Sequence, residues 1–245
     1  MLMRQRVVGA EALDELPVDD PAARHARRDL RRVHRFMASR WLLVRALRAA
    51  VPAPPPGRPL RLLELGAGDG TLLLDVARRL VRQWPEVALT LLDRQDLLSP
   101  RTAADYAGLG WRVRQQCCDV HQWAAQVQAD PAAPRWDVIV TTLFLHHFAD
   151  PALAALLRAV AASTRVFVAL EPRRAPLALA ASHLLALIGA NGVTRSDAVL
   201  SVRAGFRDAE IGALWPATGW QTQERAAFAF SHAFVAIAAA PMVAA

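Results

Sequence analysis

The chain has 245 residues, of which 54% are hydrophobic and 21% are charged, and its formal net charge is +7. This balance is typical of a globular protein with a sizeable core, and it excludes a disordered chain. Every basic residue apart from histidine is an arginine, a bias that codon usage in a GC-rich genome explains. We therefore give the positive charge little weight as a sign of a nucleic-acid partner.

The cysteines and the apolar stretches indicate neither a disulfide framework nor a membrane span. Cys117 and Cys118 are adjacent, so in a strand their side chains point to opposite faces and rarely form a bridge. Acidic residues at 11–20 stand where a secretory signal would have its apolar core. The stretches 175–190 and 226–245 are too short or too interrupted to cross a bilayer. We expect a cytoplasmic protein.

The first 50 residues are expected to form a loose arm followed by a helix. Residues 1–20 are acidic and weakly patterned, whereas apolar residues recur at helical spacing from 21 to 50. Arginines at many of the other helix positions indicate a solvated face, and a nucleic-acid face is the alternative. The apolar stripe, which includes Trp41, is expected to pack over the domain that follows. A proline-rich linker at 52–57 marks the boundary.

The stretch Leu62-Leu63-Glu64-Leu65-Gly66-Ala67-Gly68-Asp69-Gly70 predicts a strand, a tight turn and a helix that begins near Thr71. Glycine fits this turn because the backbone must bend sharply and approach a ligand closely. A dinucleotide fingerprint, G-x-G-x-x-G, would need its third glycine at Thr71. Here the glycines are Gly66, Gly68 and Gly70, with Glu64 two residues before the first. The amides at the helix start would face the ligand.

Further apolar runs predict strands that alternate with helices. They are residues 87–93, ending in Asp93, residues 111–120, which include Asp119, residues 136–142, and residues 165–170, followed by Glu171. A helix from Asp150 to about Ala162 precedes the last of them. This alternation predicts a parallel sheet whose ligands bind at the carboxyl ends of the strands. Asp93 is placed there to accept hydrogen bonds from the hydroxyls of a ribose.

After the fifth strand the pattern predicts an insertion and two final strands. The insertion spans about residues 172–202 and contains an apolar helix over 177–188. A short helix led by Asp208 follows, and then strands over 220–227 and 228–238.

From about residue 58 to 238 the chain resembles the class I S-adenosylmethionine (SAM) methyltransferases, with Glu64 to Gly70 matching their first motif. The resemblance implies an α/β fold with a Rossmann-like, seven-stranded, mostly parallel sheet, a C-terminal antiparallel hairpin and an N-terminal helical extension. It implies domain limits of 1–57 and 58–245, with the insertion at about 172–202 as a lid over the substrate. It also implies SAM as the cofactor, bound by Glu64, Gly66, Ala67, Gly68, Gly70, Asp93, Arg94, Asp119, Val120 and Thr142.

The stretch Leu145-His146-His147-Phe148-Ala149-Asp150 is most similar to the quinone-biosynthesis (UbiE-like) branch and its small-molecule relatives. We therefore expect a small acceptor of the phenolic, polyketide or quinol type, with O-methylation slightly preferred over C-methylation. A phenol hydroxyl benefits from a general base, and histidine suits that role near neutral pH. His147 and His146 are the candidate bases, and no metal is expected. The expected acceptor contacts are Trp41, Phe148, Glu171, His183 and Asn191.

Two alternatives stay open from the sequence. The domain could methylate RNA and use the arginine-rich helix to hold phosphates. Against that, Thr142-Leu143-Phe144-Leu145 stands where the base-amino methyltransferases have an Asn/Asp-Pro-Pro-aromatic tetrad. A nucleic-acid partner is therefore the less favoured reading. The other alternative is a SAM-binding accessory protein without activity.

Overall fold

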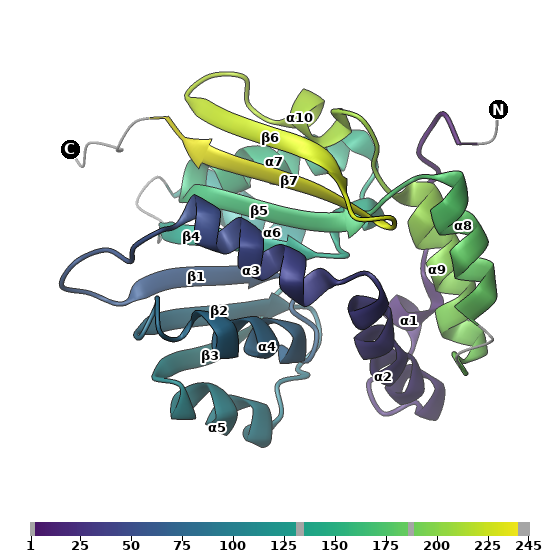
Figure 1. The fold of residues 1–245 in the computed structure, drawn as a ribbon, viewed down its shortest axis with the longest axis horizontal. Coiled ribbons are helices and arrows are strands. Elements are labelled where there is room, and N and C mark those ends of the chain that lie inside the picture. The colour runs from purple at the N-terminus through teal and green to yellow at the C-terminus, as the bar shows by residue number, and fades with distance from the viewer. Residues whose placement is uncertain (1–2, 131–134, 186–188, 240–245) are drawn as a thin grey trace.

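The computed structural model describes residues 3–130, 135–185 and 189–239, and its centre is one twisted sheet (Figure 1). The strands lie in the order β3-β2-β1-β4-β5-β7-β6, with β7 antiparallel to both of its neighbours and the other pairs parallel. This confirms the predicted fold class. The strand bounds are β1 Leu60–Leu65, β2 Val87–Asp93, β3 Trp111–Cys117, β4 Trp136–Thr142, β5 Thr164–Pro172, β6 Trp220–Ala227 and β7 Ser231–Ala238.

Helices cover both faces of the sheet. Their bounds are α1 Ala12–Glu15, α2 Pro21–Phe36, α3 Ser39–Ala50, α4 Thr71–Leu80, α5 Pro100–Gly108, α6 Val120–Ala129, α7 Asp150–Ser163, α8 Pro176–His183, α9 Gly192–Ala204 and α10 Glu210–Leu214, with a short 3₁₀ helix, η1, at Leu145–His147. None of the helices in the described part of the chain is long and apolar enough to cross a membrane.

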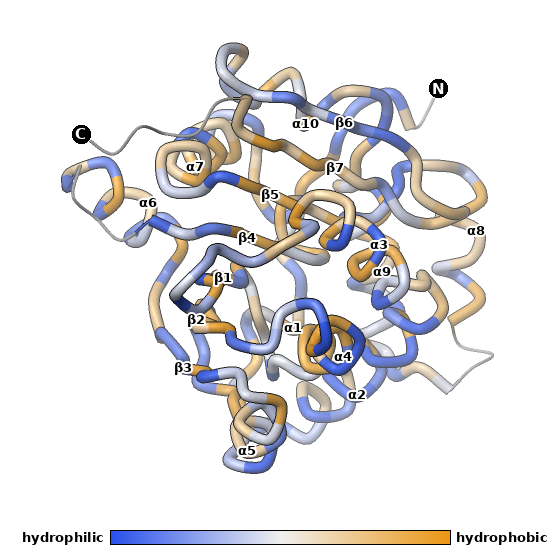
Figure 2. Tube along the Cα trace, turned by 60° about the vertical axis from the view of Figure 1, so that its left-hand side comes forward, coloured by the Kyte–Doolittle hydropathy of each residue, from blue (hydrophilic) through white to orange (hydrophobic). Residues whose placement is uncertain are grey.

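Two hydrophobic layers hold the sheet between these helices. On one face α3 and α4 contribute buried residues such as Leu47 and Leu73, and on the other α6 and α7 contribute Trp123 and Leu157. The central parallel strands are buried on both faces, which is why they appear in the sequence as nearly continuous apolar runs. Figure 2 shows hydrophobic residues along the strands in the middle of the molecule. The sheet is thus a rigid platform for whatever lies at its strand ends.

The helix predicted over residues 21–50 is two helices. Helix α2 ends at Phe36, and α3 begins at Ser39 after Ala38 adopts a left-handed conformation with φ of 55°. The periodicity alone could not show this break, because apolar spacing continues through it. The consequence is that α2 lies beyond the carboxyl ends of the strands, whereas α3 packs on a face of the sheet (Figure 1).

Residues 3–15, which we call the N-terminal strap, are held against the domain, so the expectation of a loose arm was wrong. The Arg6 side chain is 7% exposed and ion-pairs with Asp150 at 2.6 Å. It also donates to the carbonyl oxygens of Ala204 at 2.9 Å and Phe148 at 3.0 Å. Asp197 of α9 accepts hydrogen bonds from the first amides of α1. These long-range polar contacts leave no periodic signal in the sequence.

Several predicted element ends differ from the structure. Strand β3 ends at Cys117, because Asp119 instead caps α6, and β7 begins at Ser231 after a turn at 228–230. Helix α8 ends at His183, short of the predicted end at residue 188, and residues 186–188 lie outside the described part of the chain. Residues 240–245 also lie outside it.

Arg6 is expected to be the main anchor of the strap. Arg6→Ala removes two hydrogen bonds to carbonyl oxygens and the ion pair, and should lower the free energy of unfolding by about 1–3 kcal/mol. Urea denaturation followed by circular dichroism measures the difference. The matched control is Arg4→Ala, since Arg4 lies on the same segment and is exposed; its effect should stay within about 0.5 kcal/mol. Equal losses in the two variants would contradict an anchoring role for Arg6.

Candidate active site

A cavity of about 310 Å³ lies at the carboxyl ends of the parallel strands. Its walls come from the glycine turn after β1, the end of β2, the start of α6, η1, helices α2, α8 and α9, and the N-terminal strap. In Figure 1 these helices lie beyond the strand ends, on the right of the sheet. The cavity is therefore bounded by the strand ends of the sheet on one side. On the other side it is bounded by the N-terminal segments and by helices α8 and α9.

The glycine turn forms the floor of the cavity. Gly66 has a φ of 66°, and a Cβ there would lie 2.3 Å from the ring of Phe144. Gly68 has a φ of 55°, yet a Cβ there would meet no atom within 4 Å. The turn is thus tightly packed at its first glycine and open to the cavity at its second. This is the arrangement expected where backbone approaches a ligand.

Acidic groups surround that open glycine. The buried side chain of Glu64 has a pKa well above its ordinary value, because burial disfavours its charge and the charges of Asp69 and Asp93 add to that effect. Its Oε2 atom and the Thr142 hydroxyl are buried and have no hydrogen-bond partner among the described residues. A cationic or hydrogen-bonding ligand would satisfy both atoms, since buried polar groups are normally paired.

Asp93 ends β2, as predicted, and Asp119 follows the end of the neighbouring strand β3 as the N-cap of α6. Asp93 accepts hydrogen bonds from the amides of Gly68 at 2.9 Å and Gln95 at 3.0 Å. Asp119 caps α6 by accepting from the amide of His121 at 2.7 Å. Both line the cavity, as do the predicted residues Glu64, Gly66, Ala67, Gly68, Arg94, Val120 and Thr142. Gly70 does not line it; this glycine caps α4, and its carbonyl accepts from the Tyr106 hydroxyl at 2.7 Å.

The two histidines of η1 are positioned by Glu171, the buried acid at the end of β5. Glu171 Oε1 accepts from the amides of Phe144 at 3.0 Å and Leu145 at 2.9 Å. Its Oε2 lies 2.8 Å from His146 Nδ1. Both rings line the cavity, whereas Glu171 lies behind them and does not. The sequence predicted Glu171 as an acceptor contact, but the structure makes it the support of the histidine pair.

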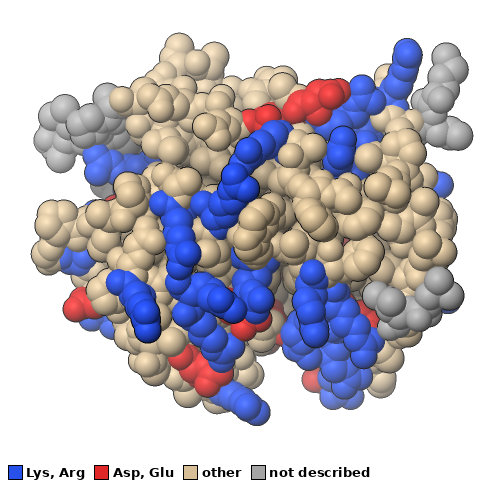
Figure 3. All heavy atoms as spheres, viewed as in Figure 1, with Lys and Arg blue, Asp and Glu red and all other residues tan. Residues whose placement is uncertain are grey.

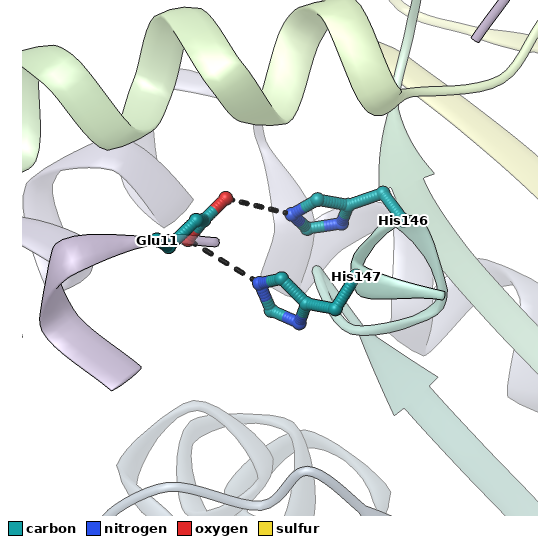
Figure 4. Close-up of side chains that lie close together, drawn as sticks. All are labelled: Glu11, His146 and His147. Atoms are coloured by element: carbon teal, nitrogen blue, oxygen red, sulfur yellow. Dashed lines mark hydrogen bonds and ion pairs between the residues drawn. The ribbon is translucent and has the colours of Figure 1, made fainter. Parts of the chain in front are cut away.

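Glu11 of the N-terminal strap completes this cluster (Figure 4). Its Oε1 lies 3.2 Å from His146 Nε2, and its Oε2 lies 3.3 Å from His147 Nε2. The hydroxyl of Ser201 on α9 also donates to Glu11. Neither Glu11 nor Ser201 was predicted from the sequence, and no motif or periodicity marks them. Only the path of the strap brings Glu11 to the cavity.

The charges in this cluster set the state of His146. Burial alone would lower the pKa of His146, but hydrogen bonds and charge interactions with Glu11 and Glu171 outweigh it and raise the pKa to about 9. For Glu11, burial would raise the pKa of the carboxyl, but the two histidines hold it well below its ordinary value. His146 is therefore a cation near neutral pH, held between two carboxylates.

Phe148 lines the cavity, whereas Trp41, His183 and Asn191, like Glu171, do not. Trp41 is 55% exposed and lies among Arg40, Arg45 and Arg48 on the outer surface. Its expected place was wrong because the chain turns at Ala38, before α3. His183 is exposed at the end of α8, where Ser182 and Leu185 face the cavity instead. Asn191 caps α9 and donates to the carbonyl of Ala22 at 3.0 Å, so it ties α9 to α2.

Arginine side chains gather over α2 and over α3 and α4 (Figure 3). Part of this charge is neutralised within the molecule, because Arg31 ion-pairs with Asp69 at 3.3 Å and Arg32 with Asp29 at 2.9 Å. Arg27 donates to Gln95 and to the carbonyl of Val18. These contacts give structural roles to arginines of α2. From the sequence alone, a nucleic-acid-binding role for this helix had stayed open as the alternative.

Structures of other proteins have the same fold. The plantazolicin methyltransferase BpumL in complex with SAH is 14% identical, with a TM-score of 0.57, over 93% of this chain and 94% of that one. Magnesium protoporphyrin IX methyltransferase from Synechocystis with bound SAM is 13% identical, with a TM-score of 0.51, over 93% and 88%. The CurJ carbon methyltransferase is 16% identical, with a TM-score of 0.51, over 91% and 56%. At these identities the likeness shows the fold.

Sequence comparison assigns the family. No curated protein matches the chain. The family model described as a methyltransferase domain matches residues 23–187, which include the glycine turn, the strand-end acids and the histidine pair. The chain therefore belongs to the methyltransferase domain family.

Proposed function

We propose that this protein transfers the methyl group of SAM to a small hydroxy-aromatic acceptor. The proposal rests on four residues near the carboxyl ends of the neighbouring strands β1, β2 and β3. Glu64, Gly68, Asp93 and Asp119 all line a single cavity. A similar order of groups was expected from the resemblance to class I methyltransferases. The His146–His147 turn, resembling the UbiE-like branch, lies on the same cavity and supports a small-molecule acceptor.

The residues present fit SAM. Its sulfonium and ammonium groups are cationic, and three acids lie near one another around the glycine turn: Glu64 of β1, Asp69 of the turn and Asp93 of β2. Unpartnered Glu64 Oε2 and the Thr142 hydroxyl offer hydrogen-bonding capacity at the floor of the cavity. Asp93 at the end of β2 is placed to bind the ribose hydroxyls, and Asp119 and Val120 to contact the adenine. We assign Arg94 and the backbone of Gly66, Ala67 and Gly68 to the same site.

When bound, SAM supplies an activated methyl group on a sulfonium, with a neutral leaving group. The protein then has to align the acceptor and exclude water. Apolar side chains line the remainder of the cavity. They come from α2, from the residues just after η1 and α8, and from the β6–β7 turn: Leu30, Val33, Phe36, Phe148, Leu185 and Phe230. Such a lining suits an aromatic acceptor better than a strongly charged one.

Deprotonation of an acceptor hydroxyl is assigned to the histidine pair. His146 is held as a cation between Glu11 and Glu171, so it is poorly suited to take a proton. His147 has a partly exposed side chain, and its Nε2 atom has no hydrogen bond among the described residues. We therefore propose His147 as the base and His146 as the group that holds the turn in place. Removal of the hydroxyl proton makes the oxygen the nucleophile, so this assignment favours O-methylation over C-methylation.

The glycine turn provides the first test. Gly68→Val places a branched side chain in the open space over this residue and should abolish SAM binding measured by calorimetry. Gly219→Val is the matched control, because Gly219 also has a positive φ, of 80°, and open space around it. Gly219 precedes β6 and does not line the cavity. Retained SAM affinity in a folded Gly68→Val protein would remove the proposed cofactor site.

Asp93 is expected to contribute to cofactor affinity through charge-assisted hydrogen bonds. Its removal in Asp93→Ala should raise the dissociation constant for SAM roughly tenfold to a hundredfold, which corresponds to about 1.5–3 kcal/mol. Asp130→Ala serves as a control, since Asp130 ends α6 and does not line the cavity. Unchanged SAM affinity in Asp93→Ala would mean that Asp93 does not bind the ribose.

His147→Ala should lower methyl transfer by roughly 10²–10⁴-fold while SAM affinity stays close to that of wild type. The assay follows S-adenosylhomocysteine release with a panel of simple phenols. His183→Ala is the matched control, because His183 is exposed and outside the cavity. Full turnover by His147→Ala would mean that alignment alone suffices and that no base acts at this position.

A further inference from the structure

We propose that Glu11, His146 and His147 form a binding site for one divalent transition-metal ion of the Zn²⁺ type. One ligand atom from each residue lies within 4.8 Å of the others, and all three side chains line the cavity. Figure 4 shows the carboxylate of Glu11 pointing toward the Nε2 atoms of both rings. Two imidazoles and one carboxylate are a common donor set for zinc and for related ions.

The separations fit ligands of one ion better than a pair of strong hydrogen bonds. The two N···O distances are 3.2 and 3.3 Å. Charge-assisted hydrogen bonds between imidazolium and carboxylate are usually about 2.7–2.9 Å long. Two ligands at zinc distances of about 2.0–2.1 Å in a tetrahedral site lie roughly 3.3 Å apart. Both N···O separations therefore match those of ligands on one ion, and all three ligand atoms lie within 4.8 Å of one another.

His147 gives the second, independent observation. Its Nε2 atom is buried and has no hydrogen-bond partner among the described residues, although Glu11 Oε2 is near. The distance is short enough for an ion pair, but no hydrogen bond forms. A buried nitrogen without a hydrogen bond is costly, and a metal ion is one group that would satisfy it.

The surrounding residues supply the support that metal ligands usually have. His146 Nδ1 lies 2.8 Å from Glu171, so the ring is oriented with its Nε2 toward Glu11. A carboxylate behind a metal-binding histidine is a recurrent arrangement, because it fixes the ring and raises its basicity. Ser201 holds Glu11 in the same way. Binding of the ion would release the proton of His146, because a ligating imidazole is neutral. The two carboxylates would then balance the charge of a divalent ion.

An ion at this site would have chemical and structural consequences. Three protein ligands leave a coordination position open to the cavity, as catalytic zinc sites do. The ion would lower the pKa of an acceptor hydroxyl bound to it, and His147, as a ligand, would no longer act as the base that removes the proton. It would also fasten the N-terminal strap to η1. Loss of His147 impairs turnover under either mechanism, so metal binding itself has to be measured.

The experiment titrates Zn²⁺ into the full chain, free of affinity-tag histidines and treated with a chelator. We expect one equivalent to bind by calorimetry and to remain after desalting, as found by elemental analysis. Glu11→Gln and His147→Ala should each weaken binding by more than about 100-fold, since even supporting residues of metal sites typically contribute 10–100-fold. Circular dichroism checks that each variant is folded.

Two controls separate this site from adventitious binding. His183→Ala removes an exposed histidine, and Cys117→Ser removes an exposed thiol; both should bind Zn²⁺ like wild type. Substoichiometric binding by the wild-type chain would overturn the proposal. So would equal affinity in wild type and folded His147→Ala or Glu11→Gln. SAM affinity, measured on the same metal-free protein, keeps failure of the metal site distinct from failure of the proposed function.

Discussion

The buried carboxylate of Glu171 is the group on which the histidine turn depends. A buried charge is costly unless it is hydrogen-bonded and paired. Here backbone amides of Phe144 and Leu145 and the ring of His146 all contact it. Because Glu171 belongs to β5, a central strand, these contacts tie a short irregular segment to the most rigid part of the molecule. The orientation of the His146 ring, and the path of the backbone that carries His147, follow from this one residue.

The cavity combines two kinds of support. The sheet fixes the glycine turn, Asp93 and Asp119, so the proposed cofactor site rests on rigid elements. The proposed acceptor side is assembled from α2, η1, the insertion and the N-terminal strap, which are joined by polar contacts between residues far apart in the sequence. Glu11, for example, lies 135 residues from His146. This division is suited to a family in which one cofactor site serves different acceptors.

The sequence predicted the sheet side well because its signals are local. Apolar strands, a glycine turn and acids at strand ends recur at fixed positions relative to one another, so Asp93 and Asp119 could be identified without a structure. The acceptor side was predicted poorly. Trp41 was misplaced because a helix break at Ala38 leaves the apolar periodicity unchanged. Glu11 was missed because its position depends on contacts such as those of Arg6 with residues beyond 145.

The most direct test of the account is whether wild-type protein binds SAM rather than a dinucleotide. Calorimetric titration with SAM and, separately, with NAD distinguishes the two, because both ligands carry a ribose that Asp93 could bind. We expect one equivalent of SAM bound per chain and no measurable heat with NAD. Binding of NAD without binding of SAM would contradict the cofactor assignment and the function derived from it.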